Sequence, residues 1–243
     1  MKIATFNISG GFYIGNEETE YLDRQAASKV DNKLLRDIID IINRENIDVI
    51  TFQEIITTDS VEYIKSIENA TELKYSVAYE LSPCNLVENT NCGLAVMSKY
   101  PIEEIKKGIF TNPNLSKTTS SGNTYYTYDK GWLSCKIENL SILTHHGFPY
   151  RRFNSSPEAN PSVFDEFDNI IKEGKYDIVT GDFNANDFMT LMTYTSSKYK
   201  RAFNEITTVD NQKFDDILLY NERTCNKQII KSFSDHYLLM IEI

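Results

Sequence analysis

The sequence predicts an α/β protein in which two packed β-sheets carry helices on their outer faces. Short apolar runs rich in β-branched residues recur along the 243 residues, and only a few segments show helical periodicity. Long polar stretches separate these elements. Many strands with few helices suit two sheets that bury one face against each other and the other face under helices.

The first predicted elements form a strand–helix–strand unit. Ile3–Asn7 is an apolar run, and Lys29–Asn43 carries apolar residues at the i, i+3, i+4 spacing of an amphipathic helix. The β-branched residues of Asp48–Gln53 predict the second strand. A second helix is predicted over Ser60–Asn69. The strands that follow are predicted at Tyr75–Tyr79, Gly93–Ser98, Trp132–Ile137 and Leu140–Leu143.

The last third of the chain holds one more predicted helix and three strands. Ser162–Glu173 is predicted as the helix, because Pro161 suits a first turn, where a missing N–H costs nothing. The strands are predicted at Asp177–Val179, Phe214–Leu219 and Tyr237–Ile243. No stretch resembles a Gly/Ser/Pro linker, so residues 1–243 are expected to form a single domain, which we expect to be a monomer.

The chain is acidic, with a net charge of −10 and a pI near 4.9. Tight non-specific binding of nucleic acid rests on lysine and arginine, so this balance argues against it. It does not exclude a nuclease, because bound divalent cations raise the local charge that a phosphodiester meets.

The sequence favours a cytoplasmic protein without a membrane anchor. No run approaches about 18 apolar residues, and the N-terminus turns polar too early for a signal-peptide core. The cysteines lack the Cys-x-x-Cys spacing of a zinc site, which favours reduced thiols. They are Cys84, Cys92, Cys135 and Cys225, of which the first two would be placed to pair across a loop in a secreted protein.

Four apolar runs carry polar side chains at one end. These side chains are Asn7, Glu54, Asp182 with Asn184, and Asp235 with His236. Cleavage of a phosphate ester needs a cation, a base for the attacking water, donors to the phosphate oxygens and help for the leaving oxygen. Carboxylate, amide and imidazole groups at strand edges can fill these roles.

Glu54 is a candidate metal ligand and His236 a candidate base. A carboxylate is a hard oxygen ligand for Mg²⁺, with Mn²⁺ as an alternative, and Asn7 would support it by hydrogen bonding or coordination. Imidazole titrates near neutral pH, and Asp215 is a candidate to fix its tautomer. The structural alternatives are a solvated charge at Glu54, a turn residue at Asn7 and a locally bonded histidine at His236.

Asp182 and Asn184 alternate along one segment. In an extended backbone both would face one side while Phe183 packs away. Asn184 would then donate to a phosphate oxygen, and Asp182 would orient water or assist the leaving oxygen. The alternative is an Asx-rich turn that caps a helix near Asp187.

Two adjacent histidines end another predicted strand. Alternation sends His145 and His146 to opposite faces, so one of them is expected to donate to the scissile phosphate. Lys130, and Arg151 with Arg152, are the nearest basic candidates for phosphate contact, with solvated surface charges as the alternative.

Aromatic side chains near the predicted site are candidates to stack on bases. They are Tyr125, Tyr126, Tyr128, Trp132, Tyr150 and Phe153. Tyr126 is predicted to contact substrate, although strand faces and core would explain Tyr126 and Tyr128 equally well.

Six short motifs occur in order between Asn7 and His236. They are Thr5-Phe6-Asn7, Gln53-Glu54, Gly93 to Ile102, Gly181-Asp182-Phe183-Asn184-Ala185, Phe214 to Leu218, and Ser234-Asp235-His236. Together they resemble the endonuclease/exonuclease/phosphatase superfamily over essentially the whole chain. The resemblance implies a four-layered α/β sandwich of two mostly antiparallel sheets with helices outside.

The resemblance also implies a division of roles among the residues above. Mg²⁺ would bind Glu54 with support from Asn7 and Asp235. His236, with Asp215 behind it, would activate water. Asn184 and a second histidine would hold the phosphate.

Three departures from the family pattern bear on these roles. Asp216 stands where an aromatic is usual, so the choice of Asp215 rests on the alignment of the motif. The Thr-His pattern favours His145, whereas the spacing to Pro149 favours His146, which is preferred. No basic insertion for DNA binding is present and the chain is short, which weakens the case for a dedicated DNA-repair enzyme.

The sequence therefore predicts a Mg²⁺-dependent phosphodiester hydrolase acting on nucleic acid, most simply an endonuclease. The first alternative is a phosphatase or phospholipase-type hydrolase of a small phosphoester such as inositol phosphate or sphingomyelin, which an acidic surface suits somewhat better. A non-catalytic binding module is disfavoured, because the functional side chains of the motifs are all present. The loops Ser82–Asn91 and Asn112–Asn123 are expected to carry specificity.

Overall fold

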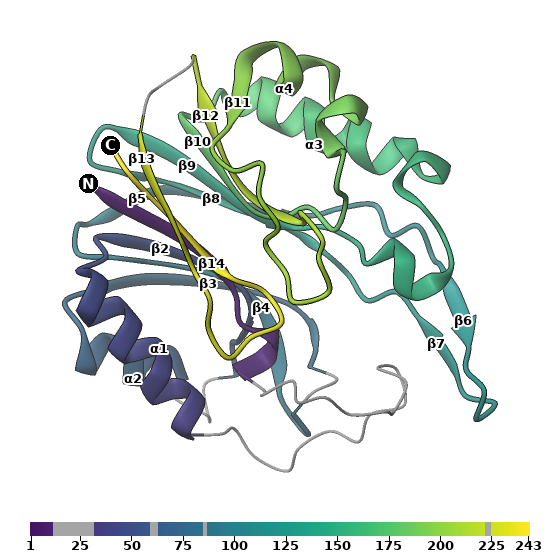
Figure 1. Cartoon of the computed structure of the whole chain (residues 1–243), viewed down its shortest axis with the longest axis horizontal. Helices are drawn as coiled ribbons and strands as arrows, with labels where there is room; N and C mark the ends of the chain where they lie inside the picture. Colours follow the sequence, from purple (N-terminus) through teal and green to yellow (C-terminus); the bar gives the residue numbers. More distant parts are fainter. Residues whose placement is uncertain (12–31, 59–62, 85–86, 222–224) are drawn as a thin grey trace.

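The fold is a sandwich of four layers. The computed structural model describes residues 1–11, 32–58, 63–84, 87–221 and 225–243. Two six-stranded sheets lie face to face, and helices cover the outer face of each (Figure 1). The layers run helix, sheet, sheet, helix, so the predicted α/β sandwich with outer helices is confirmed.

The first sheet has the strand order β13-β14-β1-β2-β4-β3. Only β1 and β2 pair in parallel. Helices α1 (Asn32–Glu45) and α2 (Tyr63–Ala70) cover its outer face, where residues such as Ile38 and Ile67 are buried. The strands are β1 (Lys2–Asn7), β2 (Val49–Ile56), β3 (Tyr75–Pro83), β4 (Asn91–Ser98), β13 (Asn226–Ile230) and β14 (Leu238–Glu242).

The second sheet has the order β11-β12-β10-β9-β8-β5, with only β9 and β10 parallel. Helices α3 (Pro161–Gly174) and α4 (Thr193–Lys198) lie outside it. The strands are β5 (Ile102–Ile109), β8 (Gly131–Ile137), β9 (Leu140–His146), β10 (Ile178–Asp182), β11 (Tyr199–Arg201) and β12 (Asp215–Tyr220).

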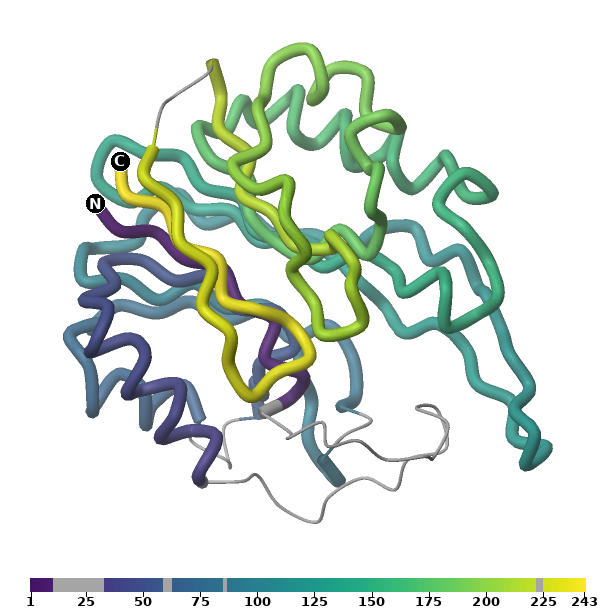
Figure 2. The backbone as a smooth tube through the Cα atoms, viewed as in Figure 1, coloured from purple at the N-terminus to yellow at the C-terminus, as the bar shows by residue number. Residues whose placement is uncertain are grey.

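A two-stranded hairpin projects from the sandwich. Its strands are β6 (Ser116–Thr118) and β7 (Thr124–Tyr126), and Figure 2 shows it reaching outward from one end of the molecule. Short 3-10 turns complete the chain at η1 (Ser9–Gly11), η4 (Tyr150–Phe153), η5 (Pro157–Ala159) and η6 (Phe188–Leu191).

The two sheets are joined by apolar packing and by a buried row of polar side chains. Leu94, Leu133 and Ile178 belong to the apolar core between the sheets. Threonine hydroxyls also meet across the interface, with 2.9 Å between Oγ1 of Thr51 and Oγ1 of Thr180. The polar row continues toward one edge of the sandwich.

Every predicted strand overlaps an observed one, and five observed strands were not predicted: β5, β6, β7, β11 and β13. Strand β5 lies at a sheet edge and exposes most of its charged residues, so it lacks the alternation of a half-buried strand. Residues 29–31 and 60–62 of the predicted helices, and residues 85–86 of the first specificity loop, lie outside the described residues.

The described helices are short or polar. None of them is long and apolar enough to cross a membrane.

Candidate active site

The sandwich brings the polar strand ends to one edge of the two sheets. Because β1 and β2 run parallel, as do β9 and β10, their carboxyl ends carry polar side chains to this edge. Strands β12 and β14 run antiparallel to their neighbours, so their amino ends lie there too. The side chains delivered are Asn7, Glu54, His146, Asp182, Asp215, Asp235 and His236.

Glu54 lies inside strand β2 and not after it, which corrects the sequence-based placement. The strand continues to Ile56, but its register with β4 shifts between Gln53 and Ile55. At this bulge Glu54 adopts a φ of 53°, a conformation that costs a non-glycine residue free energy. The bulge takes Glu54 out of the ladder and leaves its side chain 16% exposed at the sheet edge.

Gly181 allows β10 to approach β9 closely. Its φ is +143°, and a Cβ atom built there would lie 2.2 Å from the carbonyl oxygen of His145. Only glycine satisfies both conditions, so the Gly-Asp order of the motif sets the position of Asp182 beside His146.

His236 and Asp215 form a buried pair. Nδ1 of His236 lies 2.8 Å and 3.0 Å from the two carboxylate oxygens of Asp215. Burial disfavours the charged imidazolium, but the carboxylates of Asp215, Asp235 and Asp182 outweigh burial and hold the pKa of His236 well above its usual value. Nε2 of His236 is left to face the site.

Asp182 accepts three hydrogen bonds at the centre of the site. Nδ2 of Asn7 donates at 3.0 Å, and Asn184 donates from its backbone at 2.8 Å and its side chain at 3.1 Å. Asp182 is only 1% exposed, and burial, reinforced by the charge of Asp215 and opposed by that of His236, raises its pKa to about 7.

Asn184 reaches Asp182 through a turn. Its φ is 50°, so the segment is not extended as the alternation argument assumes, and the Asp182 carboxylate closes an Asx turn with the Asn184 backbone. The helix cap of the alternative is not made, because Asp187 precedes η6 without a side-chain cap bond. The second amide hydrogen of Asn184 is donated to the carbonyl oxygen of Gly147. Phe183 packs away from the site against Phe188, as expected.

His146 lies between Glu54, Asp182 and Lys130. Its Nε2 is 3.5 Å from a carboxylate oxygen of each acid, and Nζ of Lys130 is 3.1 Å from its Nδ1. Burial, aided by the charge of Lys130, lowers the pKa of His146 well below its usual value. The contacts with the two acids are therefore those of a neutral imidazole and not ion pairs.

His145 points to the opposite face of β9 and lies outside the site. Its ring packs against Phe110, Phe167 and Phe183, and neither ring nitrogen has a hydrogen-bond partner among the described residues. Burial lowers its pKa to about 3. The role of phosphate donor predicted for one of the two histidines can therefore fall only on His146.

Asp216 also points away from His236. It pairs with Arg201 and accepts the backbone N–H groups of Phe203 and Ile217. Burial, which outweighs the arginine, raises its pKa to about 7. Of the two adjacent acids, Asp215 is the one beside the histidine.

Glu54, Asn7 and Asp235 offer a set of oxygen donors that suits a hard divalent cation. Oγ of Ser9 donates to Asp235, and the Ser9 backbone N–H donates at 3.0 Å to Oδ1 of Asn7, which keeps one lone pair. Burial opposes ionisation of Asp235. The charges of His236 and Arg152 and the hydrogen bond from Ser9 outweigh burial, so the pKa of Asp235 is lowered. A second group of ligand-type atoms, all within 4.8 Å of one another, comes from Asp182, Asp215 and His236.

Several residues of the site gave no sequence signal of their own. Ser9 holds Asp235 as described, and Ser234 donates to the backbone oxygen of Asn7 at 2.8 Å. Gln53 is fully buried and donates from Nε2 to the Thr144 hydroxyl at 2.9 Å, which joins the two sheets beneath the site. The Gln-Glu and Ser-Asp-His motifs contain Gln53 and Ser234 but do not reveal these contacts.

A cavity of about 410 Å³ opens beside His236. Its apolar wall includes Phe214 and Val209, and its cationic wall includes Arg151 and Arg152. Two acids line it as well, Asp210 at 3.3 Å from Arg151 and Asp235 at 3.9 Å from Arg152. Asn184, Asp235 and His236 reach the same cavity, so substrate could reach them through it.

Tyr126 lies apart from this cavity, on strand β7 of the projecting hairpin. Of the six aromatic candidates, Tyr126 and Tyr128 are the two that are exposed, at 65% and 45%. Tyr150 and Phe153 are buried, and Tyr150 packs in the same apolar cluster as Phe148 and Phe164.

Comparisons with known proteins agree with this fold. The model described as the Endonuclease/Exonuclease/phosphatase family matches residues 4–236. No curated protein sequence matches the chain. A solved family protein from Leptotrichia buccalis C-1013-b is similar over 100% of this chain and 99% of its own, with a TM-score of 0.66 and 16% identity.

Two further solved structures are similar in fold. Sphingomyelinase C from Streptomyces griseocarneus has a TM-score of 0.56 and 12% identity, over 99% of this chain and 97% of its own. The human nocturnin catalytic domain has a TM-score of 0.61 and 15% identity, over 99% and 93%.

Proposed function

The chain belongs to the endonuclease/exonuclease/phosphatase family and is a phosphoester hydrolase, and from this premise we propose that it cleaves nucleic acid as a Mg²⁺-dependent endonuclease. The observation that carries the mechanism is the buried pair of His236 and Asp215, 2.8 Å apart, beside Asp182.

His236 is the general base. Its Nδ1 is held by Asp215, which fixes the tautomer and leaves Nε2 to take the proton of the attacking water. Asp182 lies 3.9 Å from that Nε2 and accepts hydrogen bonds from Asn7 and Asn184, so it is held where it can orient the water or assist the leaving oxygen.

The phosphate is held by donors from the second sheet. Asn184 lines the cavity. The amide N–H that it donates to the Gly147 carbonyl can instead be donated to a phosphate oxygen. Lys130 supplies a positive charge 3.1 Å from His146, whose neutral ring is able to donate a hydrogen bond.

We assign Mg²⁺, with Mn²⁺ as the alternative, to Glu54 with support from Asn7 and Asp235. When bound, the cation would polarise a phosphoryl oxygen and offset its negative charge. Lys130 Nζ lies 3.8 Å from Glu54, so this lysine balances the carboxylate until a cation does so.

The alternative is hydrolysis of a small phosphoester such as inositol phosphate or sphingomyelin, which the net charge of −10 favours. Arg151 and Arg152 both line the cavity, where Arg151 lies 3.3 Å from Asp210 and Arg152 lies 3.9 Å from Asp235. The same two residues suit a substrate with further phosphates on one side of the scissile bond.

A single domain over residues 1–243, a monomeric state and a cytoplasmic location complete the proposal. Size-exclusion chromatography with light scattering tests the monomer, and a dimeric mass would contradict it. Fractionation of the source cells tests the location.

Nicking of supercoiled plasmid tests the function. We expect cation-dependent nicking that EDTA abolishes, and His236→Ala is expected to lower turnover about a hundredfold or more while circular dichroism shows an intact fold. A folded His236→Ala variant with near-normal turnover would refute the role of His236 as the general base. If the wild-type protein hydrolyses only small phosphoesters, the endonuclease proposal is wrong and the alternative is correct.

A further inference from the structure

The projecting hairpin is held in shape by hydrogen bonds at its base. We define the hairpin arm as Asn112–Tyr128, which contains β6 and β7. Thr127 fastens its base, because its hydroxyl donates to Oδ1 of Asn112 at 2.7 Å and accepts the backbone N–H of Leu115 at 3.1 Å. Nδ2 of Asn112 donates to the backbone of Thr127 and to Asp129, each at 3.0 Å. The arm therefore holds its shape before any partner arrives.

The hairpin arm presents two aromatic rings to solvent on one side. Thr127 is buried between Tyr126 and Tyr128, which are 65% and 45% exposed. Strand β7 ends at Tyr126, and if its alternation continues for two residues, both tyrosines share the face opposite Thr127. Exposed aromatic rings in series are the feature with which proteins stack unpaired bases.

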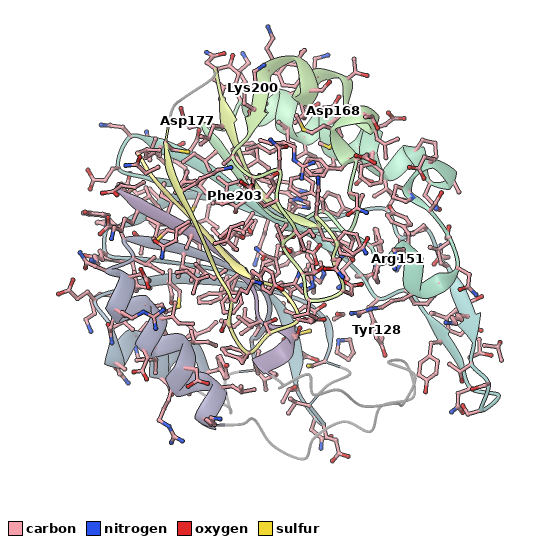
Figure 3. The ribbon with its side chains drawn as sticks, viewed as in Figure 1. Tyr128, Arg151, Asp168, Asp177, Lys200 and Phe203 are labelled. Atoms are coloured by element: carbon pink, nitrogen blue, oxygen red, sulfur yellow. The ribbon has the colours of Figure 1, made fainter. Side chains whose placement is uncertain are left out.

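The hairpin arm leads into the active site. Lys130 lies two residues beyond Tyr128, so their Cα atoms are within about 7 Å, and its Nζ lies 3.1 Å from Nδ1 of His146. Strand β6 also contacts η4, the turn that carries Arg151 and Arg152 into the cavity beside His236. Figure 3 shows Tyr128 and Arg151 from these two segments toward the same end of the molecule.

The charge of the hairpin arm differs from that of the rest of the protein. The chain holds 35 acidic residues, yet Asn112–Tyr128 contains none, and its single charged residue is Lys117. Asp129, exposed at the base between Tyr128 and Lys130, accepts a hydrogen bond from Asn112 and keeps its negative charge. Along the arm itself a polyanion meets Lys117 and no acidic side chain, before it reaches Asp129 and Lys130 at the base.

We propose that the hairpin arm is a docking surface for single-stranded nucleic acid, whose bases stack on Tyr126 and Tyr128 while the strand enters the site past Lys130. This inference rests on the proposed function, because it names the form of the substrate. A duplex would not offer its bases to the two rings, since they are already stacked and paired.

The chemistry of the tip disfavours a membrane as the partner. The turn between β6 and β7 is Thr119-Ser120-Ser121-Gly122-Asn123, which has no apolar side chain to enter a bilayer. One lysine is also too little positive charge for stable binding to anionic lipid.

Binding is tested without turnover, so that the inference can fail separately from the nuclease proposal. The probe is a fluorescein-labelled single-stranded oligonucleotide, titrated with protein in EDTA at low salt and followed by anisotropy. Tyr126→Ala/Tyr128→Ala is expected to raise Kd about tenfold or more, whereas Tyr126→Phe/Tyr128→Phe, which keeps the rings, is expected to stay within about threefold. A duplex of the same sequence is expected to bind more weakly than the single strand.

Tyr75→Ala is the matched control, because Tyr75 is 44% exposed on β3 and does not belong to the arm. Equal Kd values for wild type and Tyr126→Ala/Tyr128→Ala, or no binding by wild type, overturn the inference. Sedimentation with phosphatidylcholine vesicles that depends on the two tyrosines, without oligonucleotide binding, would assign the arm to a membrane and overturn it too. Arm-dependent binding without any nucleic-acid cleavage would uphold the arm and refute the nuclease proposal.

Discussion

At the scale of the residue, two adjacent histidines differ completely in environment. His146 contacts two acids and a lysine at the edge of the sheets, while His145, one residue away, lies among phenylalanine rings. Alternation along β9 is the cause. A residue's chemistry here depends on which face of the strand it occupies.

His145→Leu is expected to make the protein less sensitive to acid. The folded-state pKa of about 3 lies below the unfolded value of 6.5, so the unfolded chain binds the proton more readily. Wild type therefore loses stability as pH falls below 6.5, and the leucine variant lacks this loss. Urea unfolding at several pH values measures it, and an equal pH dependence in both proteins would contradict the assignment.

Asp215→Asn is expected to move the acid limb of the rate profile to lower pH. The carboxylate raises the pKa of His236, and the base form of His236 is the active one, so turnover rises as pH passes that pKa. Without the charge the pKa falls, and the plateau rate falls as well because the ring is no longer oriented. A plot of kcat against pH checks both effects, and an unmoved limb would count against Asp215 as the partner.

At the scale of the element, irregularities in the strands shape the site. The bulge in β2 removes Glu54 from its ladder, and the glycine of β10 brings Asp182 against β9. Cross-sheet hydrogen bonds then hold the two halves together. Nε2 of Gln53 donates to Thr5 at 3.1 Å within its own sheet and to Thr144 at 2.9 Å on the other.

Gln53→Met is expected to lower the free energy of unfolding by about 1–3 kcal/mol, because the buried hydroxyls of Thr5 and Thr144 lose their partner. Methionine is similar in size, so little cavity is created. The control is Gln228→Met, at an exposed position on β13. Urea denaturation measures the free energy of unfolding of both variants. If both variants lose the same amount, the buried row of polar side chains does not stabilise the fold.

At the scale of the whole molecule, a net charge of −10 is combined with buried acids at one edge. This arrangement opposes a polyanionic substrate unless cations intervene. A bound divalent cation, Lys130 and the guanidinium groups of η4 would supply the positive charge along one path.

Mg²⁺ is expected to raise the thermal unfolding midpoint, because it binds the folded chain alone. At a hundred times its Kd the gain is about 2.7 kcal/mol. Glu54→Gln is expected to lose most of this gain, whereas Glu72→Gln, which removes the same charge from a side chain that is 77% exposed, is expected to keep it. Differential scanning fluorimetry with matched ionic strength makes the comparison, and equal shifts in both variants would refute Glu54 as a ligand.

The sequence by itself determined the fold class and the family, because strand periodicity and the six ordered motifs are local patterns. It also named the polar side chains that meet at the sheet edge. It missed β5, β11 and β13, which are edge strands with charged or mixed faces, so no apolar pattern marks them.

The tertiary structure alone decided which of two neighbours faces the site and what lies beside it. The selection of His146 over His145, and of Asp215 over Asp216, depends on strand register. The contact of Lys130 with His146 and that of Ser9 with Asp235 join residues distant in sequence. Such long-range contacts form only when the two sheets pack. Burial between the sheets fixes which side chains of each strand face inward, and it brings the polar strand ends together.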